Sequence, residues 1–126
     1  MTDGAARDRE LSEGEGLAAQ WVGLLLAPAT FFAHLQIAYV LVPRVCAHGG
    51  EVWIHVAGVA SVVLAAVGAL VAWRVWERAG RGAPGDGGGP APRARFLAVI
   101  GVAESALFVL LLLAQWLAAF FISPCQ

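Results

Sequence analysis

Three long apolar runs constrain this chain more than any other feature. Residues 16–43 and 52–73 contain no charged side chain, and residues 95–122 contain only Glu104 after the initial Arg95. About 20 apolar residues are enough for a helix to cross the hydrocarbon core of a bilayer. The sequence therefore predicts an all-α integral membrane bundle of three transmembrane helices. The expected helices cover about residues 17–43, 51–77 and 94–122.

The composition also points to lipid as the solvent. The chain is 60% hydrophobic and 13% charged, whereas soluble domains are typically about 45–50% apolar and about 25% charged. All of its basic side chains are arginine, and alanine, glycine and valine are abundant. This usage is typical of a GC-rich bacterial genome, so we expect a multi-pass protein of the bacterial inner (cytoplasmic) membrane.

The segments outside the apolar runs differ in character. Residues 1–16 form an acidic tail without apolar periodicity, which we expect to be disordered or a short frayed helix. Residues 44–51 are short enough for a tight turn. Residues 78–93 are rich in glycine and proline and predict a flexible loop. The predicted organisation is thus a tail, 1–16, followed by one transmembrane domain, 17–126.

The placement of arginine predicts the orientation. Most arginines flank the second loop: Arg74, Arg78, Arg81, Arg93 and Arg95. Only Arg44 lies in the first turn. Because loops rich in arginine near the spans stay in the cytoplasm, we expect the second loop and the N-terminus to be cytoplasmic and the C-terminus periplasmic. The arginine-rich loop is also suited to contact anionic lipid headgroups.

The two cysteines should lie on the same side of the membrane. Cys46 follows the first helix and Cys125 follows the third, so both face the periplasm in this topology. An oxidising compartment favours a disulfide between them. Two alternatives remain open: a pair of free thiols, and metal ligation by Cys46 and Cys125 with His48 and His55, since thiolate and imidazole suit copper or zinc.

Six of the polar residues within the predicted spans are candidates for intramembrane polar contacts: Thr30, His34, Gln36, Tyr39, Glu104 and Gln115. At about 100° per residue, Thr30 and His34 share one side of the first helix, and Gln36 and Tyr39 lie roughly opposite His34. We expect one side to face the other helices and the other side to face a partner protein. A charged Glu104 exposed to lipid would cost on the order of 3 kcal/mol, so we expect it to be protonated, hydrogen-bonded or paired.

Cofactor and enzyme signatures are weak. Two histidines on different helices could ligate a haem, but His34 and His55 differ in expected depth by about 9 Å at the helical rise. The glycine-rich stretch of the second loop lacks the features of a phosphate-binding loop. We therefore expect a protein that is not an enzyme and has no resident cofactor and no nucleic-acid partner. Small residues on the second helix, such as Gly58, Ser61 and Ala65, predict close helix packing.

Several short motifs carry a resemblance. They are W-x-x-L-L-x-A-P from Trp21, H-L-Q-x-x-Y-x-L-V-P-x-x-C from His34, W-x-H from Trp53, R-F-L from Arg95 and S-P-C ending at Cys125. The ensemble resembles small, uncharacterised proteobacterial three-helix membrane proteins associated with haem-copper (cytochrome c) oxidase and related respiratory gene clusters.

The resemblance implies a non-catalytic accessory subunit or assembly partner of a respiratory electron-transfer complex. The leading candidate for that complex is a cytochrome oxidase. Helices with polar groups on two sides and an external disulfide suit such a role. Two alternatives stay open: a membrane haem- or quinone-binding redox protein, and a small homo-oligomeric channel or transporter.

Overall fold

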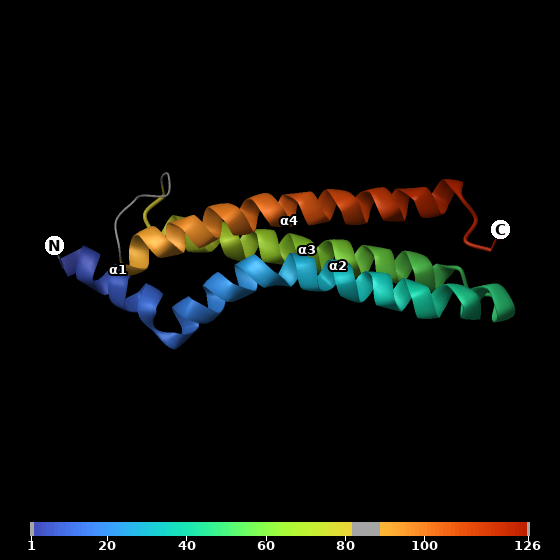
Figure 1. The fold of residues 1–126 in the computed structure, drawn as a ribbon, viewed down its shortest axis with the longest axis horizontal. Coiled ribbons are helices and arrows are strands. Elements are labelled where there is room, and N and C mark those ends of the chain that lie inside the picture. Colours follow the sequence, from blue (N-terminus) through green and yellow to red (C-terminus); the bar gives the residue numbers. More distant parts are fainter. Residues whose placement is uncertain (1, 82–88, 126) are drawn as a thin grey trace.

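The computed structural model describes residues 2–81 and 89–125, and this part of the chain is helical with short turns. The helices are α1 (Thr2–Ser12), α2 (Gly14–His48), α3 (Val52–Arg78) and α4 (Pro90–Phe121). Helices α2, α3 and α4 run side by side along the molecule, and α1 lies at the end where α4 begins (Figure 1). We call this the linker end, and the opposite end, where α2 joins α3, the turn end.

The three long helices have the properties of membrane spans. Each is long and apolar enough to cross a bilayer, with mean hydropathy of 1.7 for α2, 2.3 for α3 and 2.6 for α4 in the most apolar window. Many large apolar side chains are exposed on the outside of the bundle, including Phe32, Leu110 and Phe121. The expectation of an all-α chain with three helices long and apolar enough to span a membrane is confirmed for the described residues.

Helix α2 extends further than its sequence indicates. We expected it to stop near Pro43, but it continues through this proline to His48. A proline removes one backbone donor, and a membrane helix tolerates this when neighbouring groups satisfy the freed carbonyl. The turn therefore shrinks to Gly49, Gly50 and Glu51, where both glycines have positive φ, 82° and 101°. Figure 1 also shows that the N-terminal third of α2 runs at an angle to the rest of the helix. Pro28 lies inside this helix.

Most of the acidic tail, Thr2–Ser12, forms helix α1, which packs against α2 and α4. Leu11 of α1 is 2% exposed and packs with Val75, Ala79 and Ala94. The buried side-chain amide of Gln20 donates to the Leu11 carbonyl over 2.9 Å. Of the two expectations for this tail, the structure has the short helix. Its packing through Leu11 was not predicted, because a single apolar residue is too little to produce a periodic pattern.

Small residues set the distance between the long helices. A Cβ on Gly23 of α2 would lie 2.9 Å from the Ala72 Cα of α3, and a Cβ on Gly101 of α4 would lie 2.8 Å from the Gly23 carbonyl oxygen. All three helices therefore meet backbone to backbone at this level. Membrane helices gain packing energy through such close approach, since lipid supplies no hydrophobic drive between them.

The middle of the bundle has an apolar core. Ala27, Ala65 and Leu112, one from each long helix, are at most 1% exposed. Phe31 and Phe108 pack beside them, with ring centroids 5.2 Å apart. The predicted flexible loop, 78–93, has its central part, residues 82–88, outside the described residues. Its final residues belong to α4, which begins at Pro90 and not at residue 94.

Candidate functional site: polar groups along the bundle

A disulfide closes the turn end. Cys46, in the last turn of α2, is bonded to Cys125, just beyond α4, with their Cα atoms 5.5 Å apart. The predicted pairing is confirmed. Because both sulfurs are in this bond, neither is available as a thiolate ligand for a metal. His48 is exposed, and its Nδ1 lies 3.3 Å from the Arg44 carbonyl oxygen. Among residues 2–81 and 89–125, no three histidine, cysteine or acidic side chains gather as a metal site.

His55 is held by an aromatic neighbour near the turn end. The indole N–H of Trp116 donates to His55 Nδ1 over 3.2 Å, and the Phe120 ring lies 4.6 Å from the imidazole, centroid to centroid. An indole nitrogen can only donate, so Nδ1 must accept and the proton of the neutral ring is on Nε2. This tautomer leaves no lone pair for a metal or haem iron, which makes His55 a poor ligand.

His34 has the opposite tautomer. The Ser61 hydroxyl donates its one proton to the Ala57 carbonyl over 2.7 Å, and His34 Nδ1 lies 2.9 Å from the same hydroxyl oxygen. The imidazole must therefore be the donor in this second bond, with its proton on Nδ1. Its Nε2 keeps a lone pair, and no described residue donates a hydrogen bond to it.

A hollow surrounds the His34 side chain between α2 and α3. It has a volume of about 340 Å³, and its lining includes Thr30, Ala33 and His34 of α2 with Ala57, Ala60 and Ser61 of α3. We call it the His34 groove. Ala33 and Ala60 are exposed, so the groove opens on the outer surface of the bundle. The Thr30 hydroxyl donates to the Leu26 carbonyl over 2.7 Å.

The polar residues of α4 lack partners. Glu104 and Gln115 are half-buried, and in each the Oε1 atom is buried without a hydrogen bond from any described residue. Eleven residues separate them, so they share a side of α4 about 16 Å apart along the axis. The sequence analysis expects Glu104 to be protonated, hydrogen-bonded or paired; its Oε1 has no hydrogen-bond partner among the described residues, and the protonated form stays a prediction.

Gln36 and Tyr39 face away from the bundle. Tyr39 is 81% exposed, and Gln36 is also exposed. A shallow groove along this side of α2 is lined by Gln36, Ile37, Val40, Leu41 and Arg44. We call this surface, with Tyr39 beside it, the α2 outer face. Thr30 is buried and His34 is half-buried on the bundle side, so one polar side of α2 faces the other helices and the other faces outward.

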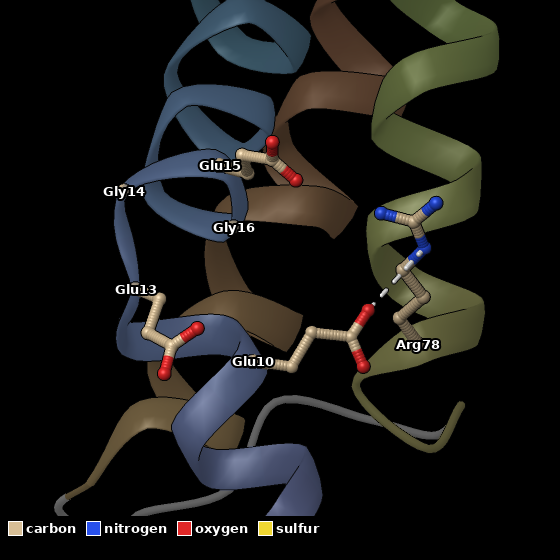
Figure 2. A pocket seen from close by; sticks show the side chains of 6 residues that line it. All are labelled: Glu10, Glu13, Gly14, Glu15, Gly16 and Arg78. Carbon is tan, nitrogen blue, oxygen red and sulfur yellow. Dashed lines mark ion pairs between the residues drawn. The ribbon is translucent and has the colours of Figure 1, made fainter.

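An acidic hollow lies at the linker end, where α1 meets α2 (Figure 2). Glu10, Glu13 and Glu15 line it together with Arg78 of α3. Glu10 forms an ion pair with Arg78 at 4.0 Å, and both side chains are more than half exposed. Such exposed pairs stabilise a fold only weakly. The hollow is therefore a solvated junction between α1 and the bundle.

Sequence reasoning missed the partners of both histidines, Ser61 and Trp116. A signal for Ser61 was present. Residues 23 and 72, 27 and 68, and 34 and 61 are in contact, and the two numbers in each pair add up to 95. Two antiparallel helices with small residues at matching intervals must pair in this register. The comparisons with known proteins add nothing here, since no protein family, curated protein or solved structure matches the chain.

Proposed function

We propose that this protein is a non-catalytic accessory subunit or assembly partner of a respiratory electron-transfer complex, with a cytochrome oxidase as the leading candidate. It would lie in the bacterial inner membrane with the linker end in the cytoplasm and the turn end in the periplasm. Two observations support this orientation. Arginines gather at the linker end, as they do on cytoplasmic sides, and the disulfide is at the turn end, which suits an oxidising compartment.

The α2 outer face is the observation that carries the proposal. The exposed amide of Gln36 would otherwise face lipid, where an amide without hydrogen bonds costs about 2–7 kcal/mol. Interfacial snorkelling can serve Tyr39 and Arg44, but Gln36 has a short side chain and lies further from the turn end. A partner helix with polar side chains would satisfy this amide.

Glu104 and Gln115 support a second contact with protein. Both side chains are half-buried, so part of each reaches the surface of α4, while one oxygen of each is enclosed by the chain itself without a partner. Unsatisfied polar groups within a membrane are costly. Glu104 and Gln115 lie on α4, whereas Gln36 and Tyr39 lie on α2. A partner that touches both helices would hold this protein on two sides, which suits a subunit packed into a larger assembly.

The respiratory assignment itself rests on the resemblance of the motifs that begin at Trp21 and His34. The cytoplasmic contact with anionic lipid headgroups is part of the same proposal. Arg74 and Arg93 are exposed at the linker end, whereas Arg78 pairs with Glu10 and Arg81 with Glu77. Arg74 and Arg93 are therefore the arginines best placed for lipid phosphates.

Photo-crosslinking in native membranes tests the docking surface. A photoreactive amino acid at position 39 should crosslink to a subunit of a respiratory complex, identified by mass spectrometry. The same probe at Leu110, a 64% exposed position on α4, serves as the control and should label mainly lipid. Gln36→Leu combined with Tyr39→Phe should reduce co-purification of the complex at least tenfold while leaving the disulfide intact.

Three outcomes would sink the proposal. Crosslinks from position 39 to lipid alone would leave the α2 outer face without a protein partner. Crosslinks only to a second copy of this chain would favour a homo-oligomeric channel or transporter. A purified protein with bound haem would favour a self-contained redox protein.

A further inference from the structure

We propose that the His34 groove is a binding site for a lipid-soluble quinol, whose hydroxyl donates a hydrogen bond to His34 Nε2. The groove lies between α2 and α3, on the opposite side of α2 from Gln36. The groove adjoins the α2 outer face, because Ile37 lines both. Its hydrogen-bonding groups do not include Gln36 or Tyr39, so the proposal does not depend on the docking role proposed above.

The hydrogen bonds around the groove determine what it can bind. Ser61 donates to Ala57, Thr30 donates to Leu26, and His34 donates through Nδ1 to Ser61. Each of these polar groups has thus used its proton inside the bundle. What remains toward the groove is acceptor capacity: the Nε2 lone pair and the lone pairs of two hydroxyl oxygens. The occupant must supply a donor.

The hydrogen-bond acceptors left in the groove distinguish a quinol from a quinone. A quinol has hydroxyl groups that donate, whereas a quinone has only carbonyl oxygens, which accept. A quinone in the groove would place acceptors against acceptors, and each polar group that loses its water without gaining a bond is penalised. The groove should therefore prefer the reduced form of the same ring.

Size and depth also favour a quinol over other hydroxyl-bearing lipids. A volume of about 340 Å³ lies at the small end of known ligand pockets and suits a single ring. Ser61 is nine residues into α3, which places it about 13 Å from that end of the helix, near the middle of a core about 30 Å thick. Glycerol-based lipids keep their hydroxyls at headgroup level, whereas a quinol ring can enter the hydrocarbon and reach the groove sideways.

The walls allow a flat ring to enter. Ala33, Ala57 and Ala60 contribute only methyl groups to the lining, so a ring can approach both helices closely there, and the larger apolar side chains of Ile37 and Leu64 also line the groove. His55 provides the contrast within the same bundle. Its Nδ1 is occupied by Trp116, so the exposed edge of that imidazole carries a proton and cannot accept from a hydroxyl.

Binding of decylubiquinol to the full chain in lipid nanodiscs tests the site. With ¹⁵N-labelled histidine, the His34 Nε2 resonance should be that of an unprotonated nitrogen, and titration with decylubiquinol should shift it. The His34→Phe variant assigns the signal. Ala60→Leu should fill the groove without touching His34, and Ala66→Leu, at an exposed position of α3 that does not line the groove, is the matched control.

We expect His34→Phe and Ala60→Leu to weaken quinol binding at least tenfold and Ala66→Leu to change it less than twofold. Decylubiquinone should bind at least tenfold more weakly than the quinol. Equal binding of the two redox forms would overturn the proposal. So would an unchanged affinity in Ala60→Leu, or a His34 Nε2 resonance that does not respond to the quinol. Each variant is first checked for an intact Cys46–Cys125 disulfide, so that loss of fold is recognised.

Discussion

The contact of Gly101 with Gly23 and Ala72 predicts a measurable cost for a single methyl group. A Cβ at position 101 lies 2.8 Å from the Gly23 carbonyl oxygen and 3.1 Å from the Ala72 Cβ. Optimal separations are about 3.5–4.0 Å, so α4 must move away from α2 by roughly 0.7–1.2 Å. The first obstacle is backbone, which cannot rotate aside as a side chain can.

Two opposing effects set the magnitude for Gly101→Ala. Overpacking costs about 1–3 kcal/mol, whereas replacing glycine by alanine within a helix stabilises by about 1 kcal/mol. We expect a net loss of up to about 2 kcal/mol in the free energy of unfolding. Gly23→Ala should behave similarly, since its Cβ lies 2.9 Å from the Ala72 Cα. Gly68→Ala should cost less, because a Cβ at position 68 lies 3.3 Å from its nearest neighbour, the Leu26 Cβ, which belongs to a side chain.

Unfolding by sodium dodecyl sulfate in mixed micelles, followed by tryptophan fluorescence, measures these differences. Gly14→Ala is the control, because a Cβ there meets nothing within 4 Å, and it should leave the transition unchanged or slightly raised. The reasoning is refuted if Gly101→Ala is at least as stable as both the parent chain and Gly14→Ala. It is also refuted if Gly68→Ala costs more than Gly101→Ala.

Three further predictions follow from other contacts. Gly58→Ala places a methyl 2.7 Å from the Trp116 ring, so it should displace the indole and break its hydrogen bond to His55. The displacement should shift the tryptophan fluorescence emission, and an unchanged spectrum would contradict that contact. Replacing Cys46 and Cys125 together by serine opens a loop of 79 residues. Chain entropy limits the resulting loss in the free energy of unfolding to about 4.5 kcal/mol. We expect a smaller loss in detergent unfolding because the inserted helices already restrict the unfolded chain, so a larger loss would contradict this view. Leu11→Ala removes the buried side chain that anchors α1 and should lower the stability of its packing by about 2–3 kcal/mol. Amide hydrogen exchange should accelerate in α1 but not in the core of α3. Uniform acceleration would argue against α1 as a separate unit.

The helices were predictable because each apolar run must satisfy its backbone internally in lipid. Length and charge alone therefore place α2, α3 and α4. The disulfide was predictable for a related reason, since three spans put Cys46 and Cys125 at the same end. The extension of α2 beyond Pro43 was not, because a proline reads as a boundary in water and is tolerated in a membrane helix.

The sequence predicts which sides of α2 are polar, but it does not predict the hydrogen-bond partners of the polar residues. The two sides of α2 follow from its periodicity, but the tautomers of His34 and His55 depend on partners from other helices. Ser61 and Trp116 supply those partners, and nothing local to either histidine indicates them. The anchoring of α1 through Leu11 was hidden for the same reason, since its contacts lie on α3 and α4.

The bond between Cys46 and Cys125 also constrains the order of events during synthesis. In the proposed membrane topology, Cys46 emerges from the ribosome early, but its partner follows α4 and can reach it only after the third helix has crossed the membrane. A chain whose last helix fails to insert leaves its two cysteines on opposite sides of the bilayer. In that topology the disulfide forms only in molecules in which all three helices have inserted. A protease or assembly factor that distinguishes thiol from disulfide could therefore separate fully inserted molecules from partly inserted ones.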